Sequence, residues 1–270
     1  MKTVLSVLLL LSGLPAAAQD WAKPRLAKSS RHQEWVQVKN GDRTVQAFVV
    51  YPEVKNKAAA VVVIHEIFGM TEWVQGMADQ FAEAGYIAIA PDLLSGMAPN
   101  GGRTSDIAPD KVGEAISKLP PDQITADLNA VADYVTRLPA ANGKLAVAGF
   151  CWGGGQTFRF ATNRADIIAA LSFYGPPPKP EDMTRIKAKV YGFYGENDAR
   201  IDAMIPDAEK AMKAAGKFYE PVIYKGAGHG FMRSGEAPPP TDPAQMPAYD
   251  ANKQARNDAW VRVKEILKKM

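Results

Sequence analysis

The cysteine at position 151 lies in a pattern that is typical of a catalytic nucleophile. Residues 149–153 read Gly-Phe-Cys-Trp-Gly, after the apolar run 144–148 and before a segment rich in small residues. The pattern Gly-x-Ser-x-Gly at a strand-to-helix junction presents a serine on a sharp turn, and here Cys151 takes its place. Glycine is needed beside such a turn because side chains there would collide with the strand and helix. The helix start favours a thiolate. Cys151 is the predicted nucleophile; the structural alternative is an inert buried thiol.

A carboxylate and a histidine follow the cysteine at the ends of two later apolar runs. Asp198 comes just beyond the run 190–194, and His229 lies in the loop 226–231, which reads Gly-Ala-Gly-His-Gly-Phe. The order nucleophile, acid, histidine is used by hydrolases whose nucleophile lies on a strand-to-helix turn. Because the chain has 3 histidines, there are few candidates for a catalytic base. Asp198 and His229 are the predicted partners of the nucleophile.

These three side chains have the chemistry for acyl transfer. We predict that Cys151 attacks a carbonyl carbon, that His229 exchanges its proton, and that Asp198 orients the imidazole. Glu196 and Asp202 are alternatives to Asp198, because they lie close to the same strand end. The structural alternatives are carboxylates that cap a turn and an ordinary loop histidine.

Residues 65–69, which read His-Glu-Ile-Phe-Gly, end the first buried apolar run. In hydrolases of this kind the loop after that strand and the residue after the nucleophile each donate a backbone N–H to an oxyanion hole. We assign these donors to Ile67 and Trp152. Glu66 stands between apolar residues, where an unpaired carboxylate is costly. A zinc-binding His-Glu-x-x-His helix is excluded because position 69 is glycine, and neither a metal nor a cofactor is predicted.

The elements that must position these residues indicate an α/β fold with a mostly parallel central sheet. Apolar runs without alternation, joined by amphipathic segments, are typical of a parallel sheet covered by helices on both faces. The runs are 60–65, 86–90, 145–150, 168–174, 190–194 and 218–224, and the helical segments are 73–84, 124–138, 156–163, 205–215 and 250–269. Before them, residues 35–39 and 44–51 alternate around Asn40-Gly41-Asp42, which predicts an antiparallel hairpin.

Two irregular segments are longer than a connection requires. Residues 95–121 include the run Pro-Asn-Gly-Gly at 99–102 and one expected helix at 110–119, and the loop 235–249 contains three consecutive prolines. Such loops on an α/β scaffold often shape the mouth of a pocket, and the alternative is an exposed connection.

Composition excludes several classes of protein. The 270 residues are 47% hydrophobic and 23% charged, with a net charge of +3, which is ordinary for a folded domain. Disordered, collagen-like and disulfide-dense chains are therefore excluded. Nucleic acid is not expected as a partner, because no concentrated basic stretch is present. We expect a monomer that binds a small-molecule substrate.

The first eighteen residues resemble an export signal. Lys2 precedes the apolar run 4–14, Pro15 ends it, and three alanines at 16–18 offer a cleavage site. The run is shorter than the roughly 20 residues needed to cross a bilayer, so no stable membrane anchor is expected, and an uncleaved anchor is the alternative. The predicted divisions are a signal peptide at 1–18, a lead-in at 19–34 and one domain at 35–270. The protein is expected in the periplasm or the medium.

Taken together, the motifs resemble the dienelactone hydrolases, also called carboxymethylenebutenolidases, which have the α/β-hydrolase fold. The resemblance covers roughly residues 35–268 and lies in the motifs at 65–69, 90–93, 149–154, 194–198 and 228–231. It implies a Cys-His-Asp hydrolase that opens the ring of an unsaturated enol-lactone. It also implies that Glu66 holds the resting thiol of Cys151 as a neutral group and later takes its proton. A thiol kept neutral in this way resists oxidation.

The resemblance further implies that two arginines bind a carboxylate on the substrate. Arg233, four residues after His229, matches one of them. The other would follow the Pro-Asp-Leu segment, where this chain has Leu94-Ser95-Gly96-Met97, and Arg103 lies further on without a secure match. The substrate carboxylate is therefore held differently, or the substrate is not dienelactone.

The leading hypothesis is an exported, cofactor-free hydrolase of lactones or small carboxylic esters that works through a thioester acyl-enzyme. A broad carboxylesterase would differ only in the shape of its pocket. A protein of another class, a sensor or binding protein that uses its thiol for redox chemistry, is the third hypothesis. Turnover of 4-nitrophenyl acetate, measured beside thiol titration, separates hydrolysis from oxidation.

Overall fold

The computed structural model describes residue 19 and residues 21–270. An eight-stranded sheet forms its centre, with the strand order β1-β2-β4-β3-β5-β6-β7-β8. The strands are β1 (Gln33–Asn40), β2 (Arg43–Val50), β3 (Ala58–Ile64), β4 (Ile87–Pro91), β5 (Ala141–Phe150), β6 (Ile167–Phe173), β7 (Lys189–Gly195) and β8 (Tyr219–Tyr224). The β1–β2 and β2–β4 pairs are antiparallel, and every other neighbouring pair is parallel.

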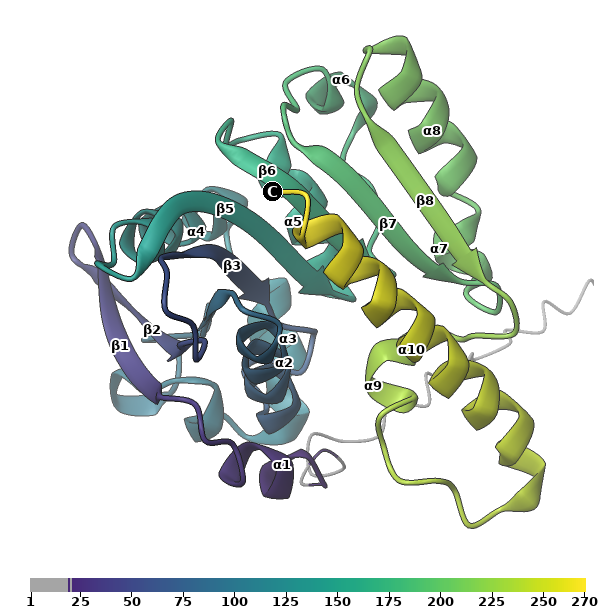
Figure 1. Cartoon of the computed structure of the whole chain (residues 1–270), viewed down its shortest axis with the longest axis horizontal. Helices are drawn as coiled ribbons and strands as arrows, with labels where there is room; N and C mark the ends of the chain where they lie inside the picture. Colours follow the sequence, from purple (N-terminus) through teal and green to yellow (C-terminus); the bar gives the residue numbers. More distant parts are fainter. Residues whose placement is uncertain (1–18, 20) are drawn as a thin grey trace, which may run out of the picture.

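The central strands are apolar on both faces because helices cover both. All seven residues of β3 are buried, as are all five of β4. Side chains on one face of the sheet form a core cluster with α4 (Pro121–Thr136), α5 (Trp152–Ala161) and α8 (Ile205–Ala214). Side chains on the other face form a second cluster with α2 (Glu72–Glu83) and α10 (Met246–Leu267). Figure 1 shows α10 crossing the near face of the sheet, with α4 and α5 behind it. The predicted fold, a mostly parallel sheet with an N-terminal hairpin and helices on both faces, is confirmed.

The larger helices lie where the periodicity predicts them. They are α2 (Glu72–Glu83), α3 (Pro109–Ser117), α4 (Pro121–Thr136), α5 (Trp152–Ala161), α8 (Ile205–Ala214) and α10 (Met246–Leu267). Four shorter helices come without a sequence prediction, namely α1 (Lys23–Ala27), α6 (Pro180–Met183), α7 (Ala199–Asp202) and α9 (Phe231–Ser234). Helix α5 begins four residues before the predicted 156. The three glycines at 153–155 lower the helix propensity of this first turn, so the sequence does not predict it. Close packing requires these glycines.

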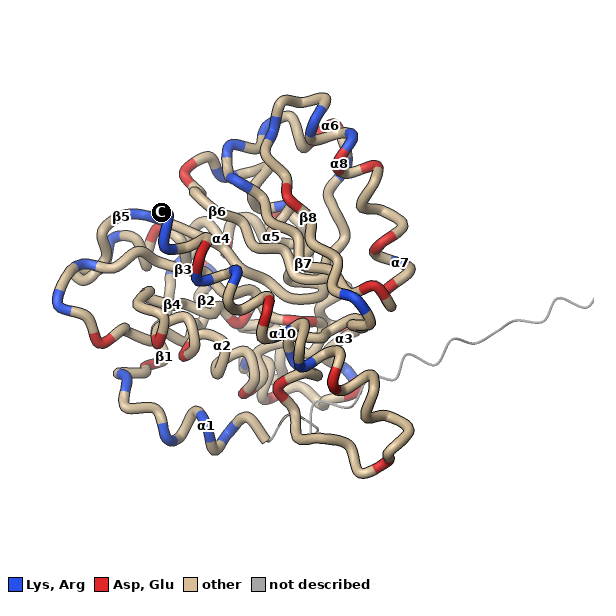
Figure 2. The backbone as a smooth tube through the Cα atoms, turned by 45° about the vertical axis from the view of Figure 1, so that its right-hand side comes forward, with Lys and Arg blue, Asp and Glu red and all other residues tan. Residues whose placement is uncertain are grey.

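The segment before β1 is fastened to helix α2 by charge pairs. Its basic residues form a row in Figure 2, where α1 carries several blue segments. Arg31 binds both carboxylate oxygens of Asp79, at 2.9 and 2.7 Å, and Ser29 also donates to Asp79. Asp79 is buried, so its negative charge needs these donors. The predicted lead-in at 19–34 thus contains a helix, and β1 begins at Gln33, two residues earlier than predicted.

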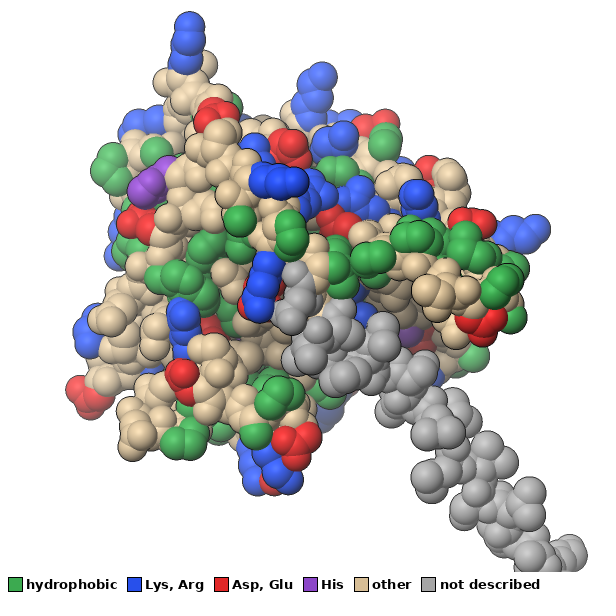
Figure 3. Space-filling view, turned by 90° about the horizontal axis from the view of Figure 1, so that it is seen from below, with side chains coloured by type: hydrophobic (Ala, Val, Ile, Leu, Met, Phe, Trp, Pro, Cys, Tyr) green, Lys and Arg blue, Asp and Glu red, His purple; other side chains and the backbone are tan. Residues whose placement is uncertain are grey.

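Charges are mixed elsewhere on the surface. In the space-filling view of Figure 3, blue, red and green side chains are interspersed across the visible face. Within the described residues, no helix is both long and apolar enough to cross a bilayer. The predicted signal peptide at 1–18 lies outside the described residues.

Candidate active site

Cys151 lies at the carboxyl end of β5, on a turn that only tight packing can hold. Its backbone has a φ of 55° and a ψ of −117°, a conformation that residues other than glycine rarely adopt. The Cys151 N–H donates to the carbonyl of Phe173 at 3.0 Å, and the Cys151 carbonyl accepts from Gly155 at 3.2 Å. Such strain persists only where the surroundings enforce it, and it is concentrated at functional sites.

The two glycines of the motif permit this turn because no side chain fits in their place. A Cβ on Gly149 would overlap the carbonyl oxygen of Gly153. A Cβ on Gly153 would overlap the carbonyl oxygens of Ile64 and His65, at the end of β3. The turn after β5 and the end of β3 are thus in direct backbone contact, which fixes the cysteine relative to the loop 65–69.

The structure brings Cys151, His229 and Asp198 together. Cys151 Sγ lies 3.1 Å from Nε2 of His229, and Nδ1 of His229 lies 2.5 Å from Oδ2 of Asp198. Asp198 is the residue at the start of α7, after β7, and is buried. Cys151 and His229 are partly exposed, so a substrate can reach the sulfur. This arrangement suits a nucleophile, a proton carrier and an orienting carboxylate.

The surroundings of His229 favour its charged form. Burial acts to lower the pKa of His229, but the hydrogen bonds to Asp198 and Cys151 outweigh burial and raise the pKa to about 10. The imidazole therefore carries a positive charge at neutral pH. A cation 3.1 Å from the sulfur attracts negative charge on it.

The two alternative carboxylates make other contacts. Glu196 accepts a hydrogen bond from the Gly226 N–H at 2.8 Å and so supports the loop that carries His229. Asp202 makes no hydrogen bond to His229 within the described residues, and one of its oxygens is buried without a partner. Burial, followed by repulsion from Asp198 and Glu196, raises the pKa of Asp202. Of the three carboxylates, Asp198 is the one that the geometry joins to the imidazole.

The two predicted oxyanion donors belong to the two segments that are in backbone contact at the cysteine turn. Trp152 is the first residue of α5, where a backbone N–H lacks a helical acceptor. Within the described part of the chain, neither the Trp152 N–H nor the Ile67 N–H donates to a protein acceptor. The Trp152 ring stacks on His65, with ring centroids 5.4 Å apart and planes 14° apart. His65 in turn contacts the Glu66 carbonyl through Nδ1 at 2.9 Å, which ties the two donor segments together.

Glu66 is paired with Arg233 and not with the cysteine. Arg233 Nε donates to Glu66 Oε2 at 2.9 Å, and their side chains are 14% and 2% exposed. The guanidinium also lies over the Phe68 ring, 5.2 Å from its centroid. Burial raises the pKa of Glu66, and the charge of Arg233 opposes that change. The thiol contact implied by the resemblance is thus absent from this arrangement, in which the sulfur faces His229.

Arg103 packs on strand β1. Its guanidinium lies over the Trp35 ring of β1, 3.9 Å from the centroid, and donates to Ser105. Strand β1 is separated from β5 by three strands in the sheet. At about 4.8 Å between neighbouring strands, this corresponds to about 19 Å across the sheet.

Tyr174 was missed by the sequence reading. It follows β6 with a φ of 40°, is fully buried, and contacts the His229 ring edge-on with centroids 5.1 Å apart. Among the described residues its hydroxyl has no hydrogen-bond partner. Burial, followed by the charge of Glu66, raises the pKa of Tyr174 well above the ordinary value. The signal that points to it is its place at the carboxyl end of the strand beside β5, where catalytic groups gather in parallel sheets.

Glu236 anchors the loop after His229, and its role also escaped prediction. Its carboxylate accepts hydrogen bonds from Trp73 Nε1 at 3.0 Å and Gln80 at 2.9 Å, both on α2. Arg25 of α1 lies 2.6 Å away and Arg256 of α10 lies 3.4 Å away. The side chain is 11% exposed, so the loop is held by a largely buried network. These partners come from three separate helices, which no local pattern reveals.

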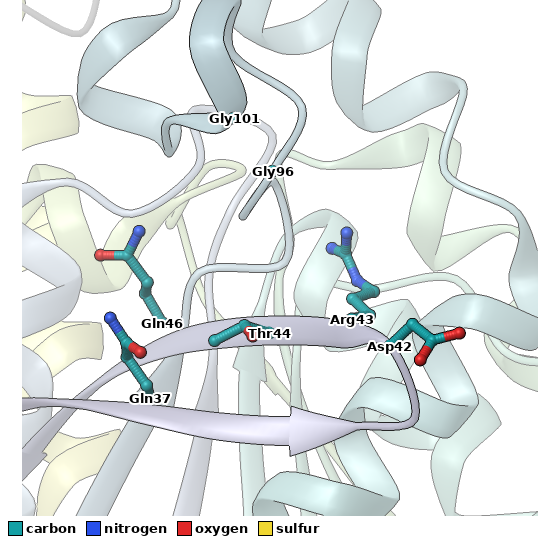
Figure 4. Close-up of a pocket in the computed structure, with 7 residues that line it drawn as sticks. All are labelled: Gln37, Asp42, Arg43, Thr44, Gln46, Gly96 and Gly101. Carbon is teal, nitrogen blue, oxygen red and sulfur yellow. The ribbon is translucent and has the colours of Figure 1, made fainter.

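A surface cavity lies away from these residues. It has a volume of about 580 Å³ and is lined by Gln37, Asp42, Arg43, Thr44, Gln46, Gly96 and Gly101. Figure 4 shows these residues on the β1–β2 hairpin and the loop facing it. No predicted site residue lines this cavity. Within the described residues, no group of three or more His, Cys, Asp or Glu side chains is arranged to hold a metal.

Comparisons with known proteins agree with this fold. The sequence profile of the "Dienelactone hydrolase family" matches residues 45–270. A protein of Escherichia coli (strain K12) named "Putative carboxymethylenebutenolidase" is 31% identical over 221 residues, which is 77% of this chain and 76% of that protein. A protein of the same name from Saccharolobus solfataricus is 29% identical and spans 84% of this chain and 94% of its own. A crystal structure titled "Putative Dienelactone Hydrolase" from Klebsiella pneumoniae has a TM-score of 0.76 and 25% identity, and covers 90% of this chain and 100% of that one. The chain belongs to the dienelactone hydrolase family and is a hydrolase with the α/β-hydrolase fold.

Proposed function

We propose that this hydrolase cleaves lactones or small carboxylic esters with Cys151 as nucleophile, His229 as proton carrier and Asp198 as orienting carboxylate. The observation that supports the proposal most strongly is the pair of contacts at His229, 3.1 Å to the sulfur and 2.5 Å to the carboxylate. Distances of this size permit proton transfer along the three groups. The strained turn that exposes the sulfur supports the same assignment.

The reaction begins with attack of the Cys151 thiolate on the substrate carbonyl. The C–S bond forms while the carbonyl electrons move to oxygen, and the N–H groups of Ile67 and Trp152 are proposed to bind that oxyanion. The C–O bond then breaks, and the leaving alkoxide takes a proton from His229. For a lactone, this alcohol stays attached to the acyl group. Water then attacks the thioester and gives its proton to His229, and the thiolate leaves.

Glu66 is proposed to take the thiol proton before attack. The Glu66 side chain is buried, with 2% of its surface exposed. Burial raises the pKa of Glu66, so that it accepts a proton more readily than an ordinary glutamate. Arg233 holds Glu66 in the position described, with the sulfur directed to His229. After the thiolate has left, Glu66 returns this proton to the sulfur and pairs with Arg233 again, so that the proposed cycle alternates Glu66 between the thiol and Arg233.

Two other functions are alternatives to hydrolysis of lactones and small esters. A broad carboxylesterase would use the same three residues and differ in which acyl groups it accepts. A thiol-based sensor or binding protein would need a reactive sulfur but no base and acid beside it, and the contacts at His229 favour hydrolysis over that function. Export by residues 1–18 to the periplasm or medium is proposed from sequence alone.

The test is hydrolysis of 4-nitrophenyl acetate and a panel of lactones by the purified protein. Turnover with a trapped acyl adduct on Cys151, detected by mass spectrometry after acid quench, supports the proposal. Oxidation of the thiol without any turnover would favour the sensor. Turnover that persists in the Cys151→Ala variant would contradict the assignment of the nucleophile.

A further inference from the structure

A buried carboxylate that the proposed reaction does not use follows the end of β4. Asp92 is fully buried, and it accepts three hydrogen bonds. Its Oδ1 accepts from the Leu94 N–H at 3.1 Å and from the Thr104 hydroxyl at 2.7 Å, and its Oδ2 accepts from the Thr104 N–H at 2.9 Å. None of these donors is a charged side chain. A carboxylate buried in this way is costly unless hydrogen bonds satisfy it, so its main contact, Thr104, indicates its role.

Asp92 determines which way the Thr104 hydroxyl points. A carboxylate can only accept hydrogen bonds, so the hydroxyl proton of Thr104 is directed to Asp92. The lone pairs of the same oxygen are then free to accept, and the Met70 N–H donates to them at 3.3 Å. Thr104 therefore joins the end of β4 to the segment that follows the loop 65–69.

The Thr104 side chain also packs against the turn that contains Ile67. The Gly69 N–H donates to the Glu66 carbonyl at 3.0 Å, which closes a turn with Ile67 inside it. Gly69 has a φ of 70°, and an added Cβ there would overlap the methyl group and the hydroxyl of Thr104. The carboxyl end of this turn is thus held by contact with Thr104 and by the hydrogen bond to Met70.

The amino end of the same turn is held from the residue next to Asp92. Burial lowers the pKa of His65, so its ring is neutral and one ring nitrogen can accept. The Leu93 N–H donates to Nε2 at 3.4 Å, which leaves the proton on Nδ1 to be donated to the Glu66 carbonyl at 2.9 Å. Both ends of the turn that carries Ile67 are therefore bound to the segment that begins at Asp92.

We propose that Thr104 and Asp92 are positioning residues for the oxyanion hole: the Thr104 hydroxyl, oriented by Asp92, holds the turn 66–69 so that the Ile67 N–H meets the carbonyl oxygen of the substrate. This inference rests on the proposed function, in which that N–H binds the oxyanion. A donor fixed in advance stabilises the charge that develops in the transition state. Loosening the turn should therefore lower kcat and leave KM nearly unchanged.

The Thr104→Val variant tests the role of the hydroxyl, because valine keeps the shape of threonine. With 4-nitrophenyl acetate, kcat is expected to fall at least about tenfold while KM changes little. Thr104→Ser keeps the hydroxyl and should keep most of the activity. Thr71→Val is the matched control, since the Thr71 hydroxyl is buried in the neighbouring turn but has no hydrogen-bond partner within the described residues. The control should keep the kcat of the wild type.

Alkylation of Cys151 by iodoacetamide separates a positioning role from general damage. The sulfur attacks the CH₂ carbon, the C–S bond forms as the C–I bond breaks, and iodide leaves, so no oxyanion arises. The alkylation rate depends on the thiolate beside His229, and in Thr104→Val it should stay within about twofold of the wild-type rate. If circular dichroism shows that Thr104→Val does not fold, Thr104→Ala, which leaves more room in the core, takes its place in both assays.

Three results would overturn the inference. They are an unchanged kcat in Thr104→Val, an equal loss of turnover and alkylation, and a serine variant as slow as the valine variant. Each of them leaves the hydrolase intact. Wild-type protein that is alkylated but turns over neither esters nor lactones means instead that the proposed function fails, and the inference fails with it.

Discussion

Cys151 Sγ lies 3.1 Å from Nε2 of His229, although 78 positions separate the two residues in the chain. The contact forms because β5 and β8 end at the same edge of the sheet, each followed by a turn that points toward the other. Asp198 approaches the far side of the imidazole from the end of β7, which lies between them. Three strand ends thus meet around one ring, and each can be tested separately.

Replacing the sulfur should remove hydrolysis. Cys151→Ala is expected to lower kcat by at least about 10³-fold, because no other group can form the acyl intermediate. Cys151→Ser keeps a nucleophilic atom, but the hydroxyl is far less acidic and should also lose most of the activity. Steady-state kinetics with 4-nitrophenyl acetate measures both. Full activity in the serine variant would show that the acidity of the sulfur is unimportant.

Asp198→Asn should lower kcat while the fold stays intact. The amide cannot stabilise the charged imidazole, so a loss of roughly 10²–10⁴-fold is expected with little change in KM. Glu196→Gln is the matched control, because Glu196 contacts the Gly226 N–H and not the imidazole. An equal loss in both variants would contradict the assignment of Asp198.

His229 should make the protein less stable as the pH rises. Its pKa is raised from an ordinary 6.5 to about 10, so the folded protein holds this proton more tightly than the unfolded chain. The resulting stabilisation is complete below about pH 6.5 and is lost as the pH rises through about 10. Thermal unfolding of the wild type and of His229→Gln, followed from pH 6 to pH 10.5, checks this. The difference in Tm should shrink across that range, and a constant difference would contradict it.

Gly153→Ala should disrupt the turn that carries the cysteine. The added methyl group would overlap the carbonyl oxygens of Ile64 and His65. We expect the free energy of unfolding to fall by about 1–3 kcal/mol, with a loss of activity as Cys151 moves. Gly76→Ala in α2 is the control, since nothing lies within 4 Å of its added Cβ, and it should gain about 0.5–1 kcal/mol. Chemical denaturation measures both variants.

Much of the fold could be predicted from hydrophobic runs alone. Each predicted strand appears within a few residues of its expected place because parallel strands buried on both faces must be continuously apolar. The motif around Cys151 could also be read locally, since its glycines reflect contacts with the neighbouring backbone. Short helices such as α1 and α9 gave no periodic signal, because four or five residues do not span two turns.

The pairing of side chains could not be predicted in the same way. The sequence places Glu66 and Arg233 at the site but does not show that they bind each other, because they are 167 positions apart. Tyr174 looked like the last residue of a buried strand, and only the structure shows its positive φ and its unpartnered hydroxyl. These contacts form where the ends of separate strands come together in the fold. Local residue preferences do not determine which side chains meet there.

The carboxylate of Glu236 joins the amino-terminal segment to the loop that bears the imidazole. Arg25 reaches it from one side, and Glu236 itself stands three residues after Arg233. Disturbing helix α1, for example by fusing a bulky tag close to residue 21, would therefore also disturb the position of Glu236 and of the loop before it. Purification tags are better placed after Met270, and kinetic constants from amino-terminally tagged protein should be compared with those from untagged protein.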